Sequence, residues 1–91
     1  MKTRAHIILH GRVQNVSFRI GAQKQAILNS LKGWVKNNSD GTVEIIVEGT
    51  EENIKKLLGW CSQGPISADV DDMKIEWLEP TSEFTTFSIR Y

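Results

Sequence analysis

Apolar and polar residues alternate over several short segments of the chain. Ile7 and Leu9 alternate with His6 and His10, which predicts a strand over residues 5–13 with one buried face. Strand-like segments recur at four later places, which are residues 31–37, 42–49, 73–77 and 87–91. The pattern therefore predicts five strands, enough to form one sheet.

Two other segments have the spacing of an amphipathic helix. Residues 18–29 carry apolar side chains four positions apart, which fits a helix packed on a sheet. A second helix follows Thr50, which can cap it, and Glu51 and Glu52 suit the positive end of its dipole. Gly64 and the proline after it end this helix. The predicted order is strand, helix, strand, strand, helix, strand, strand.

This order is typical of a ferredoxin-like α+β sandwich with one added strand. In its split βαβ topology, two helices cover one face of an antiparallel sheet. The first and second strands run parallel, so the loop after Val13 and the turn after Asn37 leave the sheet at the same edge. Side chains from these two segments can therefore meet.

Composition narrows the class of protein. The 91 residues form one domain, residues 1–91, and 40% hydrophobic with 24% charged residues is ordinary for a soluble fold. Eleven basic residues balance eleven acidic ones, which argues against nucleic-acid and membrane partners. The single cysteine can form no internal disulfide, and the first apolar stretch is too short for a signal peptide. We therefore expect a cytoplasmic monomer.

The loop over residues 11–19 is the strongest candidate for chemistry. It joins a strand to the start of a helix, where free backbone N–H groups and the helix dipole favour an anion. Arg19 lies in the first helical turn, where a cation opposes the dipole unless an anion is bound. Its guanidinium could bind two phosphate oxygens at once. On position alone, however, a surface arginine paired with a carboxylate is the more common interpretation.

Three sequence motifs decide between these interpretations. They are GRVQNVSFR at 11–19, LKGWVKN at 31–37 and DGTVE at 40–44, and Phe87, Ile89 and Tyr91 alternate at the end. In this order and spacing the chain resembles the acylphosphatase family over nearly its whole length. The resemblance implies an enzyme that hydrolyses small-molecule acyl phosphates with no metal, cofactor or covalent intermediate.

The resemblance also implies roles for individual residues. Arg19 would bind the phosphate and Asn37 would hold the attacking water. The backbone amides that would form the phosphate cradle belong to Asn15, Val16, Ser17, Phe18 and Arg19. In this family a phosphate oxygen of the substrate accepts the proton of the water. The motifs at 11–19 and 31–37 agree, because they contain no His, Asp, Glu or Cys that could act as the base.

Asn15 is a departure from the family pattern, which usually has glycine at this place in the cradle. An inward-pointing amide there often requires a positive φ, which asparagine tolerates less easily than glycine. Asn15 therefore bears on the catalytic rate more than on the resemblance itself. On this view Asn15→Gly retains activity or raises it.

Several residues have plainer interpretations. Without the family pattern, Asn37 would be a turn residue at the end of a strand. Trp34 and Trp60 are expected to pack or to be partly exposed, and Cys61 to fill the core. The histidines of the first strand are expected to be surface residues.

Two other functions fit the same fold. RNA-binding domains stack bases on sheet aromatics, but the strand over 42–49 has none. A non-catalytic phosphate-binding or regulatory module is the serious alternative, because a protein can retain a fold and its pocket after losing catalytic activity.

Overall fold

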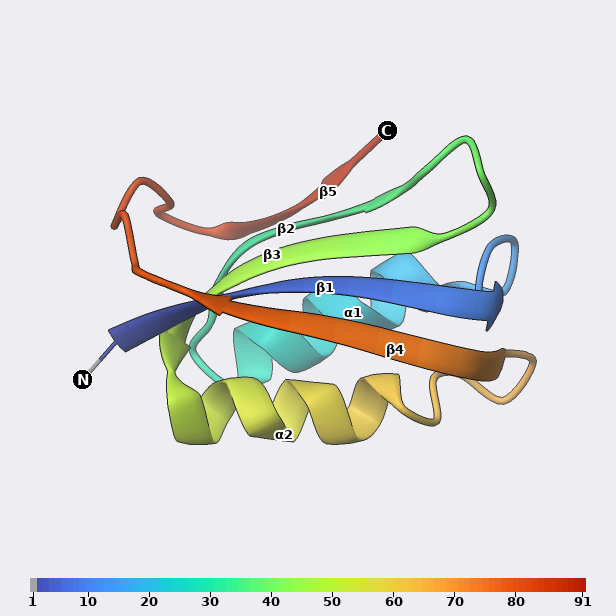
Figure 1. Cartoon of the computed structure of the whole chain (residues 1–91), viewed down its shortest axis with the longest axis horizontal. Coiled ribbons are helices and arrows are strands. Elements are labelled where there is room, and N and C mark those ends of the chain that lie inside the picture. Colours follow the sequence, from blue (N-terminus) through green and yellow to red (C-terminus); the bar gives the residue numbers. More distant parts are fainter. Residues whose placement is uncertain (1) are drawn as a thin grey trace.

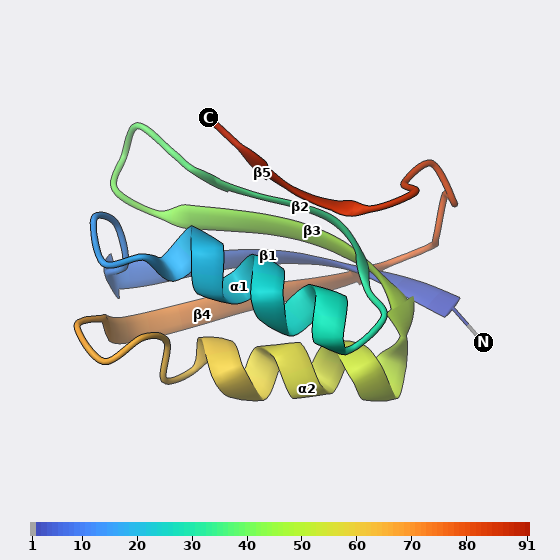
Figure 2. The same ribbon diagram turned by 180° about the vertical axis from the view of Figure 1, so that it is seen from behind.

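The computed structural model describes residues 2–91, and its elements follow the predicted order (Figure 1). Both helices pack on one face of a single sheet (Figure 2), which confirms the ferredoxin-like sandwich. Neither helix of the described residues is long and apolar enough to cross a membrane. The strands are β1 (Lys2–Arg12), β2 (Lys32–Asn37), β3 (Val43–Thr50), β4 (Asp69–Leu78) and β5 (Phe87–Arg90), and the helices are α1 (Phe18–Leu28) and α2 (Glu51–Cys61).

The sheet has the strand order β4-β1-β3-β2-β5. Strand β3 is antiparallel to both β1 and β2, so β1 and β2 run parallel and end at the same edge, as predicted. The expectation of an antiparallel sheet needs a correction, because β5 pairs parallel to β2. The connection over 79–86 carries the chain across the end of the sheet to its far edge, where it enters β5 in the direction of β2 (Figure 1).

Strand β4 begins at Asp69, whereas the sequence predicts a start at residue 73. Its first residues pair with Gly11 and Arg12 of β1, beyond a register shift that follows His10. These residues are mostly polar and exposed, so no alternation of burial marks them. Backbone hydrogen bonds to β1, rather than side-chain burial, extend the strand.

The core lies between the sheet and the two helices. Every second residue of β1 and β3 faces it, and the buried residues of α1 recur at the predicted spacing. Burial of each large side chain contributes roughly 1.5–3 kcal/mol. Cys61 is fully buried, and its burial raises the pKa of the thiol to about 12. The prediction that it fills the core is confirmed. The largest fully buried side chains include Ile7, Leu9, Phe18, Ile45, Ile54 and Leu57.

The aromatic and histidine predictions have mixed outcomes. Trp60 is partly buried and packs edge-on against Phe18, with ring centroids 5.2 Å apart, so its predicted packing role is confirmed. Trp34 is half-buried, and the cations of Lys36 and Arg90 lie 5.6 Å and 4.6 Å from the centroid of its ring. His6 and His10 are both half-buried rather than plain surface residues, and Nε2 of His6 lies 2.6 Å from the Glu44 carboxylate.

A buried carboxylate on the other face of the sheet holds the connection to β5 in place. Glu48 is 5% exposed, and its oxygens accept hydrogen bonds from the amides of Thr81 at 2.8 Å and Ser82 at 3.0 Å. The guanidinium of Arg4 lies 3.2 Å away. Burial opposes ionisation of this carboxyl, but the hydrogen bonds and the Arg4 charge together outweigh it and lower the pKa of Glu48.

The resistance of the fold to acid is therefore expected to depend on Glu48. A lowered pKa means that the carboxylate stabilises the fold above its ordinary pKa of 4.5, and that this contribution is lost as the pH falls through the lower, folded-state value. Urea unfolding from about pH 7 to pH 3 should show a steeper loss of stability for the wild type than for Glu48→Gln, which cannot titrate. The same pH dependence in both proteins would contradict this role.

Candidate active site

The loop between β1 and α1 has two residues in the left-handed region. Asn15 has φ 61°, the positive φ that an inward-pointing cradle amide often requires, and Ser17 has φ 63° and ψ 26°. Val16 between them is not left-handed. A loop that turns through left-handed residues can point successive backbone N–H groups toward one place, where they bind an anion. The sequence gives no signal for a left-handed Ser17, because serine has no special tolerance of that region.

The start of α1 adds further donors. The first amides of a helix have no acceptor within it, and the side chain of Ser17, which occupies the N-cap position, makes no capping hydrogen bond. The first turn contains no acidic residue that could offset the positive end of the dipole. This end of the helix therefore suits an anion.

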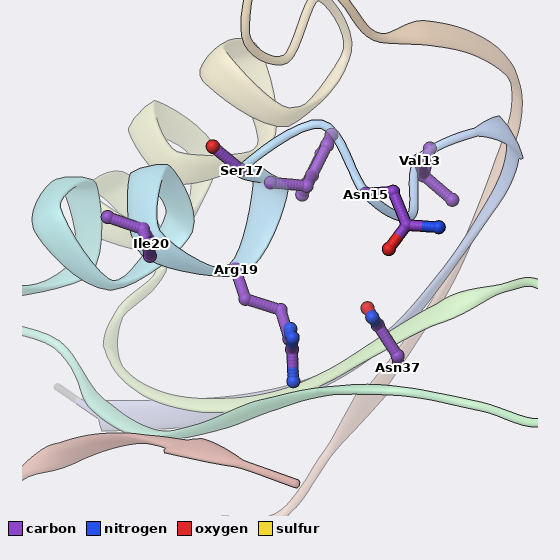
Figure 3. Close-up of a pocket in the computed structure, with 7 residues that line it drawn as sticks. Val13, Asn15, Ser17, Arg19, Ile20 and Asn37 are labelled. Atoms are coloured by element: carbon purple, nitrogen blue, oxygen red, sulfur yellow. The ribbon is translucent and has the colours of Figure 1, made fainter.

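A pocket of about 370 Å³ lies where the loop, the first turn of α1 and the end of β2 meet (Figure 3). It brings together four residues of the predicted cradle and the predicted water-holding Asn37. Val16 does not line it and packs against the core instead. Two lining residues, Val13 and Ile20, are not among the predicted site residues. The pocket is lined by Val13, Asn15, Ser17, Phe18, Arg19, Ile20 and Asn37.

Arg19 is held by the last residues of the chain. Its Nη1 donates to the backbone oxygen of Arg90 at 3.3 Å, and its guanidinium lies over the ring of Tyr91, 4.8 Å from the centroid. Within residues 2–91 no carboxylate forms an ion pair with it. The alternative of a surface arginine neutralised by a carboxylate is therefore not what the structure shows.

Asn37 is the last residue of β2, and its side chain faces the cradle loop (Figure 3). Its Oδ1 is buried and has no hydrogen-bond partner among the described residues. An unsatisfied buried acceptor costs about 1–3 kcal/mol, a cost that a bound donor such as water would remove. The alternative of a turn residue fits less well, because Asn38 and Asp40 make the side-chain hydrogen bonds of this turn.

The turn beside Asn37 is itself tied to the cradle loop. Gln14 Nε2 donates to the backbone oxygens of Asn38 at 2.7 Å and Thr42 at 3.0 Å. The hydroxyl and amide of Thr42 donate to Asp40 and lower the pKa of that carboxyl. The sequence indicates no role for Gln14 beyond its place in the first motif. Its contacts set the position of the loop relative to Asn37.

Comparison with known proteins assigns the family. The acylphosphatase family model matches residues 5–89. An acylphosphatase of Pelotomaculum thermopropionicum is 42% identical over 90 residues, which are 99% of this chain and 98% of that protein. One of Chloroflexus aurantiacus is 45% identical over 86 residues, 94% of each chain.

A solved structure agrees with the sequence relatives. The crystal structure of acylphosphatase from Bacillus subtilis superposes with a TM-score of 0.94 at 36% identity and covers 100% of both chains. The matched range includes the whole cradle loop, Arg19 and Asn37. On sequence and structure together, this chain belongs to the acylphosphatase family of hydrolases.

Proposed function

We propose that this chain hydrolyses acyl phosphates to a carboxylate and inorganic phosphate in the pocket between the cradle loop and the end of β2. One observation carries the proposal: the buried, unpartnered Oδ1 of Asn37 lies in the same pocket as the guanidinium of Arg19. An acceptor for water thus lies beside a ligand for phosphate. In-line attack by water needs a group that holds the water and a group that binds the phosphate.

The phosphoryl group binds to the cradle. The backbone amides over residues 15–19, at the positive end of α1, hold one oxygen, and the guanidinium of Arg19 holds two others. Arg19 stays charged at any working pH. Its contact with the backbone oxygen of Arg90 keeps the guanidinium in place before the substrate arrives, which reduces the entropy lost on binding.

The water is held by Asn37. Its Oδ1 accepts a hydrogen bond from the water, and the water attacks phosphorus in line with the bond to the acyl oxygen. That bond breaks, its electron pair leaves with the carboxylate, and a phosphoryl oxygen takes the proton of the water. None of the lining residues has a carboxylate, imidazole or thiol, so their contribution is positioning and charge stabilisation.

A direct assay tests the proposal. The purified protein is expected to hydrolyse benzoyl phosphate or acetyl phosphate in the presence of EDTA, with competitive inhibition by inorganic phosphate, because the cradle binds the oxygens of the product as it binds those of the substrate. Phosphate binding without turnover would favour a non-catalytic phosphate-binding module. Failure of both would contradict both functions.

A further inference from the structure

The side chain of Asn15 lies in the pocket of the proposed active site, where its amide can form hydrogen bonds. It lines the same pocket as Asn37, and Figure 3 shows it pointing from the cradle loop toward the side chain of Asn37. The side chain of Ser17, the other polar loop residue that lines the pocket, points away from Asn37 in the same view. Asn15 is thus the loop residue that turns its polar side chain toward Asn37, whose Oδ1 is unpartnered among the described residues.

The hydrogen-bonding capacity of the attacking water leaves room for one more contact. A water molecule has two hydrogens and two lone pairs. In the reaction above, one hydrogen bonds to Oδ1 of Asn37, the other moves to a phosphoryl oxygen, and one lone pair attacks phosphorus. The second lone pair can accept a hydrogen bond. A carboxamide N–H on the loop side of the pocket is a suitable donor.

We propose that Asn15 is a further catalytic residue, whose Nδ2–H donates to the second lone pair of the attacking water and holds that water together with Asn37. The inference rests on the proposed function. In Figure 3 the amide oxygen of Asn15 lies on the side of Asn37, and rotation about the terminal torsion, which is soft, brings the nitrogen to that side instead. Asn15 neither gains nor loses a proton, so the bonds that form and break are those already described.

The expectation for Asn15→Gly then differs from the one based on sequence alone. Glycine reaches the positive φ of this position freely, so the cradle and its amides are retained. The hydrogen bond to the water is lost, and kcat is expected to fall about tenfold, the effect of one neutral hydrogen bond. The inhibition constant for inorganic phosphate should change by less than about twofold, because the backbone still binds it.

A double-mutant cycle with Asn37→Ala tests whether both residues hold the same water. If they do, adding Asn15→Gly to Asn37→Ala should change kcat much less than it does in the wild type. Ser30→Gly is the matched control, since Ser30 is also left-handed, with φ 57°, but does not line the pocket. Its kcat should equal that of the wild type, and thermal unfolding should show that all variants are folded.

Other outcomes would overturn the inference. Wild-type or higher kcat in Asn15→Gly would mean that the side chain takes no part. If the inhibition constant for phosphate rose by the same factor as kcat fell, Asn15 would belong to the cradle alone. Additive effects of Asn15→Gly and Asn37→Ala on kcat would exclude a shared water. If the wild type itself did not hydrolyse acyl phosphates, the proposed function would fail and this inference with it. Turnover by the wild type therefore separates the two failures.

Discussion

Arg19→Gln is expected to reduce kcat for acyl phosphate hydrolysis at least about a hundredfold and to abolish measurable phosphate binding. The loss of a preorganised charged donor in an active site has costs of this size. Arg19 is the only cation among the residues that line the pocket, so no neighbour replaces its charge. Arg19→Lys should recover little, because a lysine cannot bind two oxygens through a planar fork.

Arg12→Gln is the matched control for Arg19→Gln. Arg12 is exposed at the end of β1 and does not line the pocket. Its removal therefore tests how far a positive charge outside the pocket attracts the anionic substrate. The effect of Arg12→Gln on turnover and on phosphate binding should be small and should decrease as salt is added. Steady-state kinetics and phosphate titration by calorimetry measure the two effects separately. Near-normal turnover in Arg19→Gln would remove this residue from the mechanism.

Asn37→Ala is expected to separate water positioning from phosphate binding. Turnover should fall at least about a hundredfold, because the attacking water loses its holder. The inhibition constant for phosphate should stay close to that of the wild type, since the cradle and Arg19 are unchanged. Loss of phosphate affinity in parallel with kcat would instead assign Asn37 to phosphate binding.

The stability of the same variant gives an independent readout. Oδ1 of Asn37 makes no hydrogen bond to another described residue, so its removal breaks no contact within the protein. The melting temperature of Asn37→Ala should therefore stay close to that of the wild type. Asn38→Ala is the control, because Asn38 Nδ2 donates to Thr42 Oγ1 at 3.0 Å and its loss should destabilise the turn. A lower melting temperature for Asn37→Ala would favour a structural role.

Local patterns determined much of the fold. The alternation in β1 and the four-residue spacing in α1 identify their buried faces, because the periods of strand and helix differ and one side of each must face the core. The element order then made β1 and β2 parallel, and this placed the cradle loop and Asn37 at one edge of the sheet. The element order therefore predicted that these two segments meet, and the resemblance to the acylphosphatase family named the two residues within them.

The tertiary structure alone decided how the edges of the sheet are completed. The parallel pairing of β5 with β2 depends on the connection over 79–86 and on its hydrogen bonds to Glu48. Thr81 is 33 residues from Glu48 in sequence, and the pattern of β3 marks Glu48 only as one polar residue of a mostly polar face. Its burial depends on a segment that periodicity does not describe.

The sequence by itself determined which groups are candidates to bind phosphate and water, because the motifs that resemble the acylphosphatase family point to Arg19, Asn37 and the loop amides. Only the tertiary structure decided how those groups are oriented in the pocket. The contact of Arg19 with Arg90 spans 71 residues, and the unpartnered Oδ1 of Asn37 and the direction of Asn15 exist only in the assembled pocket. Side-chain direction follows from backbone torsions and from neighbours distant in sequence, and neither is encoded in a local pattern.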